Sequence, residues 1–249
     1  MDGREQAQHV AEACIRRLKE RFAVKSVSLC GSLTGDSPWH LRSDIDLVVE
    51  GLAPEDYIPA LTDLWELLPP GLELDLIPLE SAPAGLVRRI RGEEKMPEDP
   101  KQALAVEIRE QLESMAPAVQ RIREYLPHAP SQPPELEIAG VGKLVHDFYN
   151  GVERIFERIV VRLDEDVPPG SHWHTDLLQR MEGTWGGKRA PVIDHALALR
   201  LLEYLRFRHL FRYTYGYELL WKNLQPLAAG IPEAFEQLRL KLQTFLSGL

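Results

Sequence analysis

The sequence predicts two domains of different fold class: an α/β domain with a small mixed sheet over residues 1–97, and an all-α helical bundle over residues 98–249. In the first part, segments with helical spacing of apolar residues alternate with short strand-like segments, which is typical of an α/β fold. Beyond residue 102, apolar residues recur only at helical spacing. Between the two parts, residues 91–102 carry charges and two prolines, which indicates a linker.

The elements of the first domain follow from these periods. Apolar and charged residues at helical spacing predict an amphipathic helix over residues 4–22. Residues 23–30 form a short apolar strand before a Gly-Ser turn, and residues 44–51 alternate like a half-buried strand. The helical period returns in residues 61–69, and residues 72–80 alternate again. The predicted order is helix, strand, strand, helix, strand.

The second domain is predicted to be a bundle of about five helices. Proline-rich or glycine-rich segments separate the long apolar periods, and a proline in its first turn marks the start of the last helix. The predicted helices cover residues 103–126, 136–163, 172–181, 192–221 and 232–245.

Composition limits the possible functions. A formal net charge of −9 argues against sequence-blind coating of nucleic acid, although a local basic strip is compatible with phosphate binding. Cys14 and Cys30, the only cysteines, fit a reducing compartment and form no zinc pattern. The N-terminus is charged, and no segment approaches the roughly 18 uncharged residues of a membrane helix. The expectation is a cytoplasmic protein with no membrane contact.

Residues 30–46 hold the elements of a phosphate and metal site. The turn at Gly31 and Ser32 lets backbone N–H groups approach a triphosphate, and Ser32 adds a hydroxyl donor. Asp44 and Asp46 are two residues apart on a strand, so both carboxylates point to one face. Carboxylate oxygens are ligands that magnesium prefers.

A third carboxylate joins this pair if the predicted strands are neighbours. The alternation of residues 72–80 puts Glu73 and Asp75 on one face, and a neighbouring strand would bring Asp75 beside Asp44 and Asp46. Three such carboxylates bind one or two divalent ions and activate an attacking oxygen. Taken singly, an Asp-x-Asp pair on a solvent-facing strand and a Gly-Ser turn are both common without any function.

Together, the spacing Gly-Ser-x11-Asp-x-Asp and the third acidic strand resemble the minimal nucleotidyltransferases, relatives of DNA polymerase beta, over about residues 1–97. The resemblance implies that Gly31 and Ser32 hold the triphosphate of ATP. It also implies that Asp44 and Asp46 hold Mg²⁺, and that Asp75 completes the metal site and acts as the base. The spacing is one residue longer than the family's commoner form, which we expect to lengthen the loop only.

The second domain resembles the HepT-like HEPN domains, the toxins of HepT/MNT toxin–antitoxin systems, over about residues 100–249. The segments that carry this resemblance are "SHWHTDLLQRM", "RAPVI" and "LRFRHLFRYTYGYELLW". The resemblance implies a ribonuclease, and a homodimer joined through the helical domain in which an Arg-x4–6-His motif from each chain lines a cleft for RNA.

This sequence departs from the commoner Arg-x4-His-x-Tyr form of that motif, because it has Arg208, Tyr213 and Tyr215 at the three positions. RNA cleavage needs a group that exchanges a proton near neutral pH, which histidine does and tyrosine does not. His209 adjoins Arg208 in sequence, but the helical turn points it about 100° away. We therefore expect little ribonuclease activity.

The remaining histidines have ordinary interpretations. His172 and His174 flank Trp173, and we expect the tryptophan to pack in the core and the histidines to cap a helix or contact solvent. Other arginine–histidine pairs at a permitted spacing are explained by chance: Arg123 with His128, and Arg189 with His195.

Basic side chains concentrate on the predicted helix that carries the motif. They either pair with acidic neighbours such as Glu203 and Glu218 or form a phosphate-binding cleft, and the acidity of the whole chain favours the cleft. These basic residues are Arg200, Arg206, Arg208, His209 and Arg212.

The two resemblances together suggest a toxin–antitoxin pair fused in one polypeptide. In the separate systems, the transferase adenylylates the tyrosine of the Arg-x4-His-x-Tyr motif and thereby silences the toxin. Tyr215 occupies that position here, so it is the expected acceptor of AMP from ATP. Two alternatives remain: a HEPN ribonuclease, and a dimer that binds RNA without cutting it and is shielded by the transferase domain.

Overall fold

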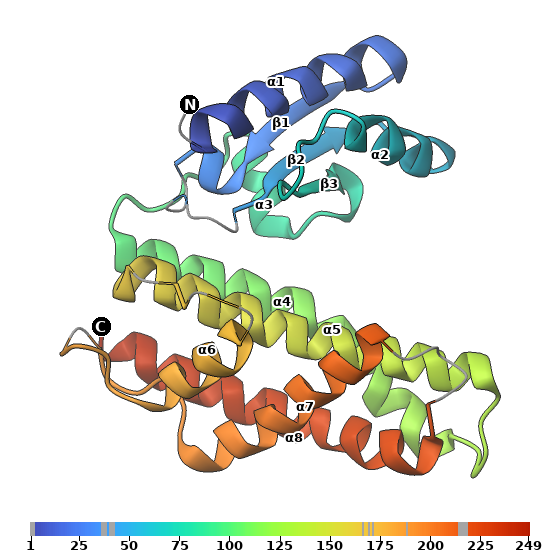
Figure 1. The fold of residues 1–249 in the computed structure, drawn as a ribbon, viewed down its shortest axis with the longest axis vertical. Helices are drawn as coiled ribbons and strands as arrows, with labels where there is room; N and C mark the ends of the chain where they lie inside the picture. Colours follow the sequence, from blue (N-terminus) through green and yellow to red (C-terminus); the bar gives the residue numbers. More distant parts are fainter. Residues whose placement is uncertain are drawn as a thin grey trace. The chain divides into compact units, whose positions relative to one another are not determined.

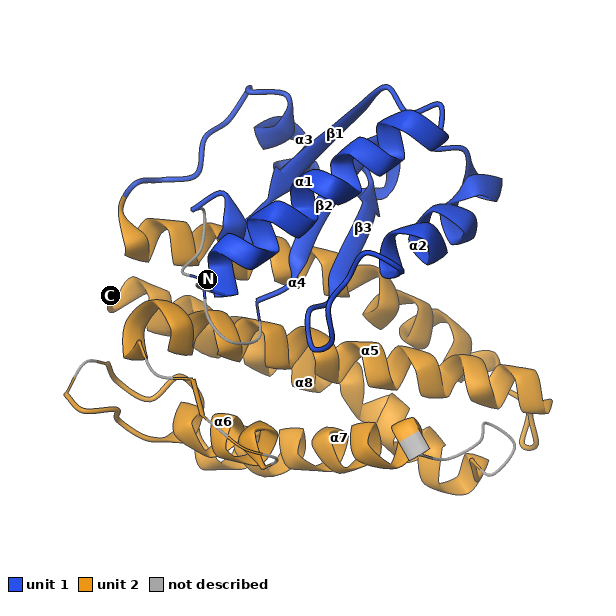
Figure 2. Ribbon diagram, turned by 45° about the horizontal axis from the view of Figure 1, so that its top comes forward, with its two compact units in different colours: residues 1–98 blue, residues 99–249 orange. Residues whose placement is uncertain are grey.

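The computed structural model divides the chain into two compact units, residues 1–98 and residues 99–249, which are described separately (Figure 2). For Tyr213 only the backbone is described. The residues that the structure describes are 3–35, 39, 43–165, 167–168, 170, 172–187, 189–213 and 219–249.

Unit 1 is a three-stranded mixed sheet with helices on both faces (Figure 1). The strand order is β1-β2-β3, with β1 antiparallel to β2 and β2 parallel to β3. The expectation of a small mixed sheet with helices is confirmed. The elements are α1 (Gly3–Arg21), β1 (Ser26–Cys30), β2 (Ile45–Glu50), α2 (Tyr57–Trp65), β3 (Leu74–Pro78) and α3 (Ala84–Ile90), with 3₁₀ turns at Gly31–Leu33, Pro54–Asp56 and Leu79–Ser81.

The alternation of β2 sorts its side chains between two cores. Ile45, Leu47 and Val49 pack with α1 and α2, whereas Val48 packs on the opposite face with α3. Period-2 alternation puts Asp46 on the same face as Val48. Helix α3 was not predicted from the sequence. Helix α2 lies four residues earlier than predicted, because Tyr57 and Ala60, not the leucines after Trp65, begin the buried stripe of that helix.

Unit 2 contains five α-helices in its described residues, as predicted, and α5 lies at their centre (Figure 1). Large side chains along α5, such as Phe148, Tyr149 and Phe156, are fully buried among α4, α6, α7 and α8. The helices are α4 (Pro100–Tyr125), α5 (Glu135–Ile159), α6 (Trp173–Glu182), α7 (His195–Tyr213) and α8 (Trp221–Ser247), with a 3₁₀ turn at Leu126–His128 and a π-helical turn at Val160–Asp164.

The predicted ends of the last two helices are wrong. Trp221, expected to end one helix, begins α8, and Pro232, expected to start the last helix, lies in the interior of α8. A proline inside a helix costs one hydrogen bond and causes a clash. The buried stripe of α8 continues from Leu224 through Ile231 to Phe245 across this proline, and its packing outweighs the local cost.

The predicted linker is shorter at its C-terminal end, because α4 already begins at Pro100. Proline is favoured at the first helical position, and the side chain of Asp99 caps the helix by accepting a 2.8 Å hydrogen bond from the backbone N–H of Gln102. Within the part of the chain that the structure describes, no helix is long and apolar enough to cross a membrane.

Candidate functional site

The strand register of unit 1 places the residues of the predicted phosphate and metal site at one end of the sheet. Cys30 of β1 pairs with Asp46 of β2, and Asp46 pairs with Asp75 of β3. Gly31 follows Cys30 directly, and Asp44 lies just before β2. Asp46 and Asp75 therefore occupy neighbouring positions on β2 and β3, and the Gly-Ser turn begins directly after the strand partner of Asp46. Asp44 lies two residues before Asp46 in the sequence.

Gly31 approaches the carboxylate of Asp46 so closely that only glycine fits. Its φ is 71°, in the left-handed region, and a Cβ atom built there would overlap Oδ2 of Asp46. The turn continues as the 3₁₀ helix Gly31–Leu33, where the hydroxyl of Thr34 donates a 2.9 Å hydrogen bond to the carbonyl of Gly31. The backbone of this turn is thus held against one of the predicted metal ligands.

The donors at this end of the sheet are of the kind that a hard cation takes. Asp46 is partly exposed and Asp75 is exposed, so both carboxylates are accessible from solvent. Among the described residues, no three His, Cys, Asp or Glu side chains are gathered closely enough to hold a metal ion. Binding of Mg²⁺ by Asp44, Asp46 and Asp75 stays a prediction.

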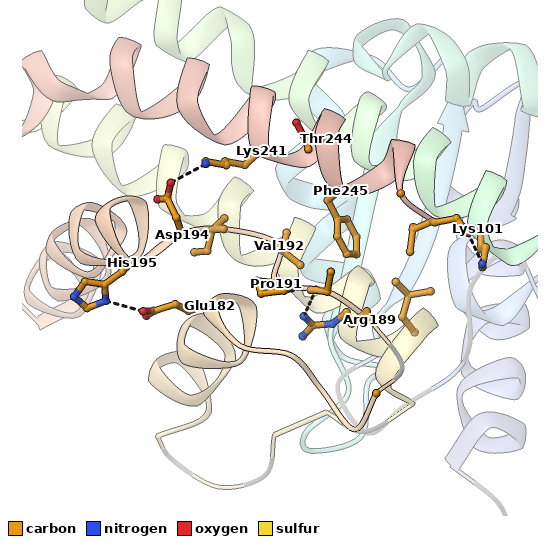
Figure 3. A pocket seen from close by; sticks show the side chains of 16 residues that line it. Lys101, Glu182, Arg189, Pro191, Val192, Asp194, His195, Lys241, Thr244 and Phe245 are labelled. Carbon is orange, nitrogen blue, oxygen red and sulfur yellow. Dashed lines mark hydrogen bonds and ion pairs between the residues drawn. The ribbon is translucent and has the colours of Figure 1, made fainter.

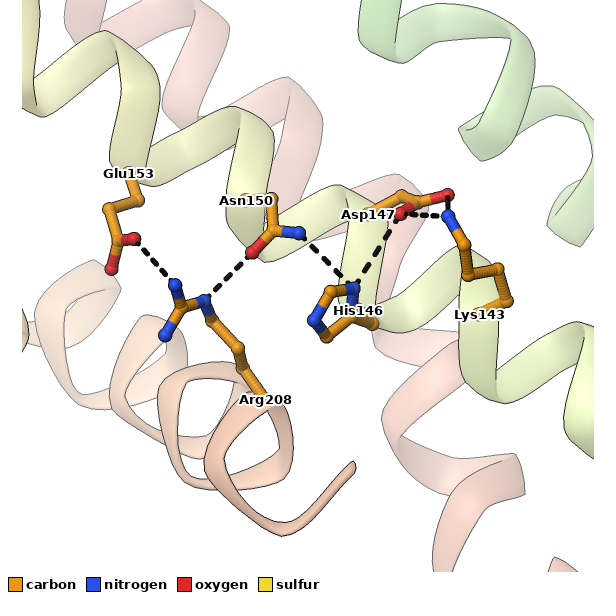
Figure 4. A network of polar contacts seen from close by, with 6 residues as sticks. All are labelled: Lys143, His146, Asp147, Asn150, Glu153 and Arg208. Carbon is orange, nitrogen blue, oxygen red and sulfur yellow. Dashed lines mark hydrogen bonds and ion pairs between the residues drawn. The ribbon is translucent and has the colours of Figure 1, made fainter. Parts of the chain in front are cut away.

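In unit 2, Arg208 of α7 lies in a buried polar cluster with Asn150 and Glu153 of α5 (Figure 4), and His174 of α6 completes it. Its Nε donates a 2.8 Å hydrogen bond to Oδ1 of Asn150, and its Nη2 forms a 3.1 Å ion pair with Oε1 of Glu153. Its Nη1 lies 3.3 Å from Nε2 of His174. Arg208, Glu153 and His174 are only 9%, 6% and 8% exposed, so this "Arg208 cluster", with Asn150 as its fourth member, is largely withdrawn from water.

The hydrogen bonds fix the tautomer of His174. A guanidinium group only donates, so Nε2 of His174 accepts from Arg208. The proton then lies on Nδ1, which donates a 2.5 Å hydrogen bond to Oε2 of Glu153. Both ring nitrogens of His174 are thus used within the protein.

A polar stripe along α5 continues the Arg208 cluster (Figure 4). The amide nitrogen of Asn150 lies 3.1 Å from Nδ1 of His146, and Nδ1 of His146 lies 3.6 Å from Asp147, which pairs with Lys143. Lys143 and Asn150 each lie three or four positions from both His146 and Asp147, so the stripe follows one side of the helix. Burial lowers the pKa of His146, and Arg208 and Lys143 add to this lowering, while Asp147 opposes it.

His209 is the exposed imidazole next to the Arg208 cluster. Its ring lies 5.4 Å from that of His174, edge to face at 79°. Burial lowers the pKa of His209, and the nearby His174 and the positive charge of Arg208 add to this lowering. His209 is turned away from Arg208 along α7. It nevertheless contacts His174 of α6, which is itself bonded to Arg208.

The structure changes the interpretation of the basic residues on α7. Arg208, expected to hold a phosphate, is bonded to Asn150, Glu153 and His174 instead. The expected partners were Glu203 and Glu218, but Arg208 pairs with Glu153 of α5, and Arg200 pairs with Glu233 of α8 at 2.9 Å. Glu218 lies outside the described residues. Arg206 and Arg212 are exposed.

The expectation that His174 caps a helix or contacts solvent is wrong, because His174 is buried and bonded to Glu153. Trp173 is partly buried against the core, as expected, and its ring stacks 3.7 Å from that of His174. His172 is exposed at the start of α6. One signal in the sequence points to the cluster: Glu153 falls within the buried stripe of α5, where a carboxylate needs a cationic partner.

A second buried arginine, Arg189, is wholly bonded within the protein. Its Nε and Nη2 donate to the two oxygens of Asp164 at 2.8 and 3.0 Å, and both side chains are 0% exposed. Its remaining N–H groups donate to the carbonyls of Arg180, Gly183 and Ala190. Arg189 thus holds the segment between α6 and α7 in place.

A cavity of about 750 Å³ lies beside Arg189 (Figure 3). At its rim, His195 bonds to Glu182 at 2.6 Å and Lys241 pairs with Asp194 at 2.7 Å. Arg189 and His195 both line this cavity, but Arg189 is buried and bonded to Asp164, whereas His195 is exposed and bonded to Glu182.

Two further pairs of residues were singled out from the sequence: Arg123 with His128, and Tyr213 with Tyr215. Arg123 and His128 are both exposed, on α4 and on the 3₁₀ turn that follows it. Tyr213 is the last residue of α7, and the expected acceptor Tyr215 lies outside the described residues.

Residues 140–249, which include most of α5 and all of α6, α7 and α8, match the family model of HepT-like proteins. The predicted similarity of the helical domain to HepT-like HEPN domains is confirmed for these residues. No curated protein and no solved structure matches the chain.

Proposed function

We propose that the protein is a magnesium-dependent nucleotidyltransferase that transfers AMP from ATP to a tyrosine of its HepT-like helical unit, with Tyr215 as the acceptor. One observation carries this proposal. The register aligns Cys30, Asp46 and Asp75 across three strands, with Gly31 held against the carboxylate of Asp46. A glycine turn beside paired carboxylates is the arrangement that a metal–triphosphate complex needs.

In the proposed reaction, backbone N–H groups at Gly31 and Ser32 bind the triphosphate, and the Ser32 hydroxyl adds a donor. Asp44 and Asp46 would hold Mg²⁺, which neutralises the charge of the departing pyrophosphate. Asp75 accepts the proton of the tyrosine hydroxyl. The phenolic oxygen bonds to the α-phosphorus as the bond from that phosphorus to the bridging oxygen breaks, and pyrophosphate leaves.

The HepT-like match supports the choice of acceptor. In HepT/MNT systems, the transferase modifies the tyrosine of the motif that corresponds here to Arg208, Tyr213 and Tyr215. An AMP group on Tyr215 would add a bulky anion seven residues from Arg208 and hinder the entry of RNA phosphates.

Labelling with ATP that carries ³²P at the α-phosphate tests the proposal. We expect Mg²⁺-dependent label on the protein, and loss of the label in the double variant Asp44→Ala with Asp46→Ala. Glu55→Gln is the matched control, because Glu55 is an exposed carboxylate of the same unit outside the Gly31 turn and the three strands. Absence of label on the wild type contradicts the transferase, whereas label that persists in Tyr215→Phe contradicts only the acceptor.

Cleavage of RNA by a homodimer of the helical unit is a second candidate, favoured by the exposed imidazole of His209 beside the Arg208 cluster. The alternative to this candidate is a dimer of the helical unit that binds RNA without cleaving it. Light scattering at micromolar concentration tests the dimer, and a monomer would contradict it. Degradation of labelled RNA tests the cleavage.

A further inference from the structure

We propose that the groove between α4 and α8 binds a small amphipathic anion, an acyl chain of medium length that ends in a carboxylate. The site lies within the helical unit and uses none of the residues of the proposed nucleotidyl transfer, so either proposal can fail without the other. It is also separate from the Arg208 cluster, which α5, α6 and α7 form. Helix α4 precedes the residues that match the HepT-like family model, so the match does not describe this groove.

The groove contains a cavity of about 660 Å³. This volume is within the range of roughly 300–1,000 Å³ that is typical of small-molecule sites. Helices α4 and α8 pack against each other, and each supplies one wall of the cavity. The walls are mainly apolar, with Phe235 and Leu242 buried and Leu112 and Leu246 partly buried. Such walls favour a ligand with an apolar body.

Two polar side chains of the groove are available to a ligand. Arg109 of α4 is exposed, and its guanidinium makes no hydrogen bond or ion pair with another described residue. The side-chain amide of Gln243 on α8 is likewise exposed and makes no hydrogen bond within the described part of the chain. A guanidinium and an amide together offer the N–H donors that a carboxylate accepts.

The packing of the two helices brings these donors to the same part of the groove. Lys101 at the start of α4 donates a hydrogen bond to the carbonyl of Leu249, just beyond the end of α8, so the two helices run in opposite directions. Arg109 and Gln243 lie eight and six residues from this contact. With the same rise per residue in both helices, they are at a similar height along the groove.

The other charged residues of the groove determine which way the ligand lies. Glu113 is exposed one helical turn beyond Arg109 and repels a carboxylate. Arg239, on the facing helix, is already paired with Glu236 at 2.9 Å, so its charge is compensated. The carboxylate of the ligand therefore binds beside Arg109, and its apolar chain extends toward Phe235 while Glu113 stays in water.

Isothermal titration calorimetry of the full-length protein with octanoate tests the charge at this site. We expect one site per chain, and Arg109→Gln should weaken the affinity by roughly 10-fold or more, because a hydrogen bond to a charged group is lost. Arg121→Gln is the matched control, since Arg121 is an exposed arginine of the same helix outside the groove. Octylammonium, with the same chain and the opposite charge, should bind more weakly than octanoate.

The length of the chain tests the apolar walls. From hexanoate to octanoate, each added CH₂ group should tighten binding roughly fourfold, because it is removed from water in the groove. Ala116→Trp should weaken octanoate binding by filling the groove, since Ala116 lines it and is exposed. Ala196→Trp is the control, because Ala196 is an exposed alanine of α7 outside the groove.

Weaker binding in Arg109→Gln and Ala116→Trp, with both controls unchanged, supports the site. No binding of octanoate by the wild type overturns it, and so does equal affinity for octanoate and octylammonium. Equal binding by the wild type and by both groove variants places the ligand elsewhere and also overturns it. Sedimentation of the same proteins identifies a different occupant: a wild-type oligomer that Ala116→Trp dissociates would mean that a second copy of the chain fills the groove.

Discussion

The candidate site of unit 1 and the Arg208 cluster of unit 2 hold their polar groups in opposite ways. In unit 1, Asp46 and Asp75 lie side by side on a small sheet and are accessible from solvent. In unit 2, Arg208 and Glu153 are buried between helices and bonded to each other. The carboxylates of the first site are thus in contact with solvent, whereas the polar side chains of the Arg208 cluster are largely withdrawn from it.

This difference separates two kinds of consequence. Breaking a buried ion pair leaves a charge without its partner in a medium of low dielectric, so the cost appears in stability. Replacing an exposed carboxylate changes little in stability, so the cost appears in ligand binding. His209 is exposed, so its replacement should also change stability little, although it lies beside the buried Arg208 cluster.

The largest effect on stability is expected for Arg189→Ala. The change removes the guanidinium that pairs with both oxygens of Asp164, whose side chain is 0% exposed, and we expect a loss of about 3–5 kcal/mol in the free energy of unfolding. Urea unfolding followed by circular dichroism measures it. Arg239→Ala is the control, because its pair with Glu236 is nearly half exposed and should contribute at most about 1 kcal/mol. Similar losses for the two variants would contradict the contrast between buried and exposed pairs.

In unit 2, the substitution Tyr213→His restores the histidine of the motif. Tyr213→His should raise RNA cleavage above the slow wild-type rate, because a positioned acid–base group contributes roughly 10²- to 10⁴-fold. The change is made together with Tyr215→Phe, so that adenylylation cannot mask cleavage. Arg208→Ala should abolish the gain. A rate that does not change would mean that position 213 does not face the substrate.

Gly31→Ala tests the close approach in unit 1. A Cβ at φ 71° would displace the carboxylate of Asp46, so we expect the thermal stabilisation by ATP and Mg²⁺ to be lost. For the wild type this stabilisation should be about 2.7 kcal/mol at a ligand concentration 100 times the dissociation constant. Gly35→Ala is the control, since Gly35 also has a positive φ but nothing lies near its Cβ position. Equal stabilisation of both variants by ATP would remove the role of the turn.

The smallest effect is a pH dependence of stability. Because His146 and His209 have pKa values lowered in the folded protein, the unfolded chain binds more protons near pH 6. The free energy of unfolding should therefore fall as pH drops through about 6.5, the ordinary histidine value, and level off below the folded values. His146→Gln and His209→Gln should each weaken this fall. An unchanged pH dependence in both variants would mean that other groups cause it.

The sequence was most informative where strand periodicity applied. Two aspartates two residues apart must share a strand face, and the third acidic strand needed only a neighbouring register to reach them, which β2 and β3 provide. The Arg208 cluster was not predictable in this way, because Glu153, His174 and Arg208 lie far apart in sequence on three helices. Their meeting depends on how the helices pack, which the spacing within one helix does not determine.

The ends of helices were the other weak point. Pro232 was interpreted as a helix start because proline is favoured there, but the apolar stripe of α8 extends through it. Trp221 was joined to the preceding helix because the apolar pattern runs on past Tyr213. Local preference lost to tertiary packing in both cases.

The intact mass of the protein before and after incubation with ATP and Mg²⁺ tests the central proposal most directly. We expect a species heavier than the unmodified chain by one AMP, absent from the double variant Asp44→Ala with Asp46→Ala, and peptide mapping should place the added mass on Tyr215. A wild-type mass equal to that of the unmodified chain both before and after incubation would contradict nucleotidyl transfer to this protein.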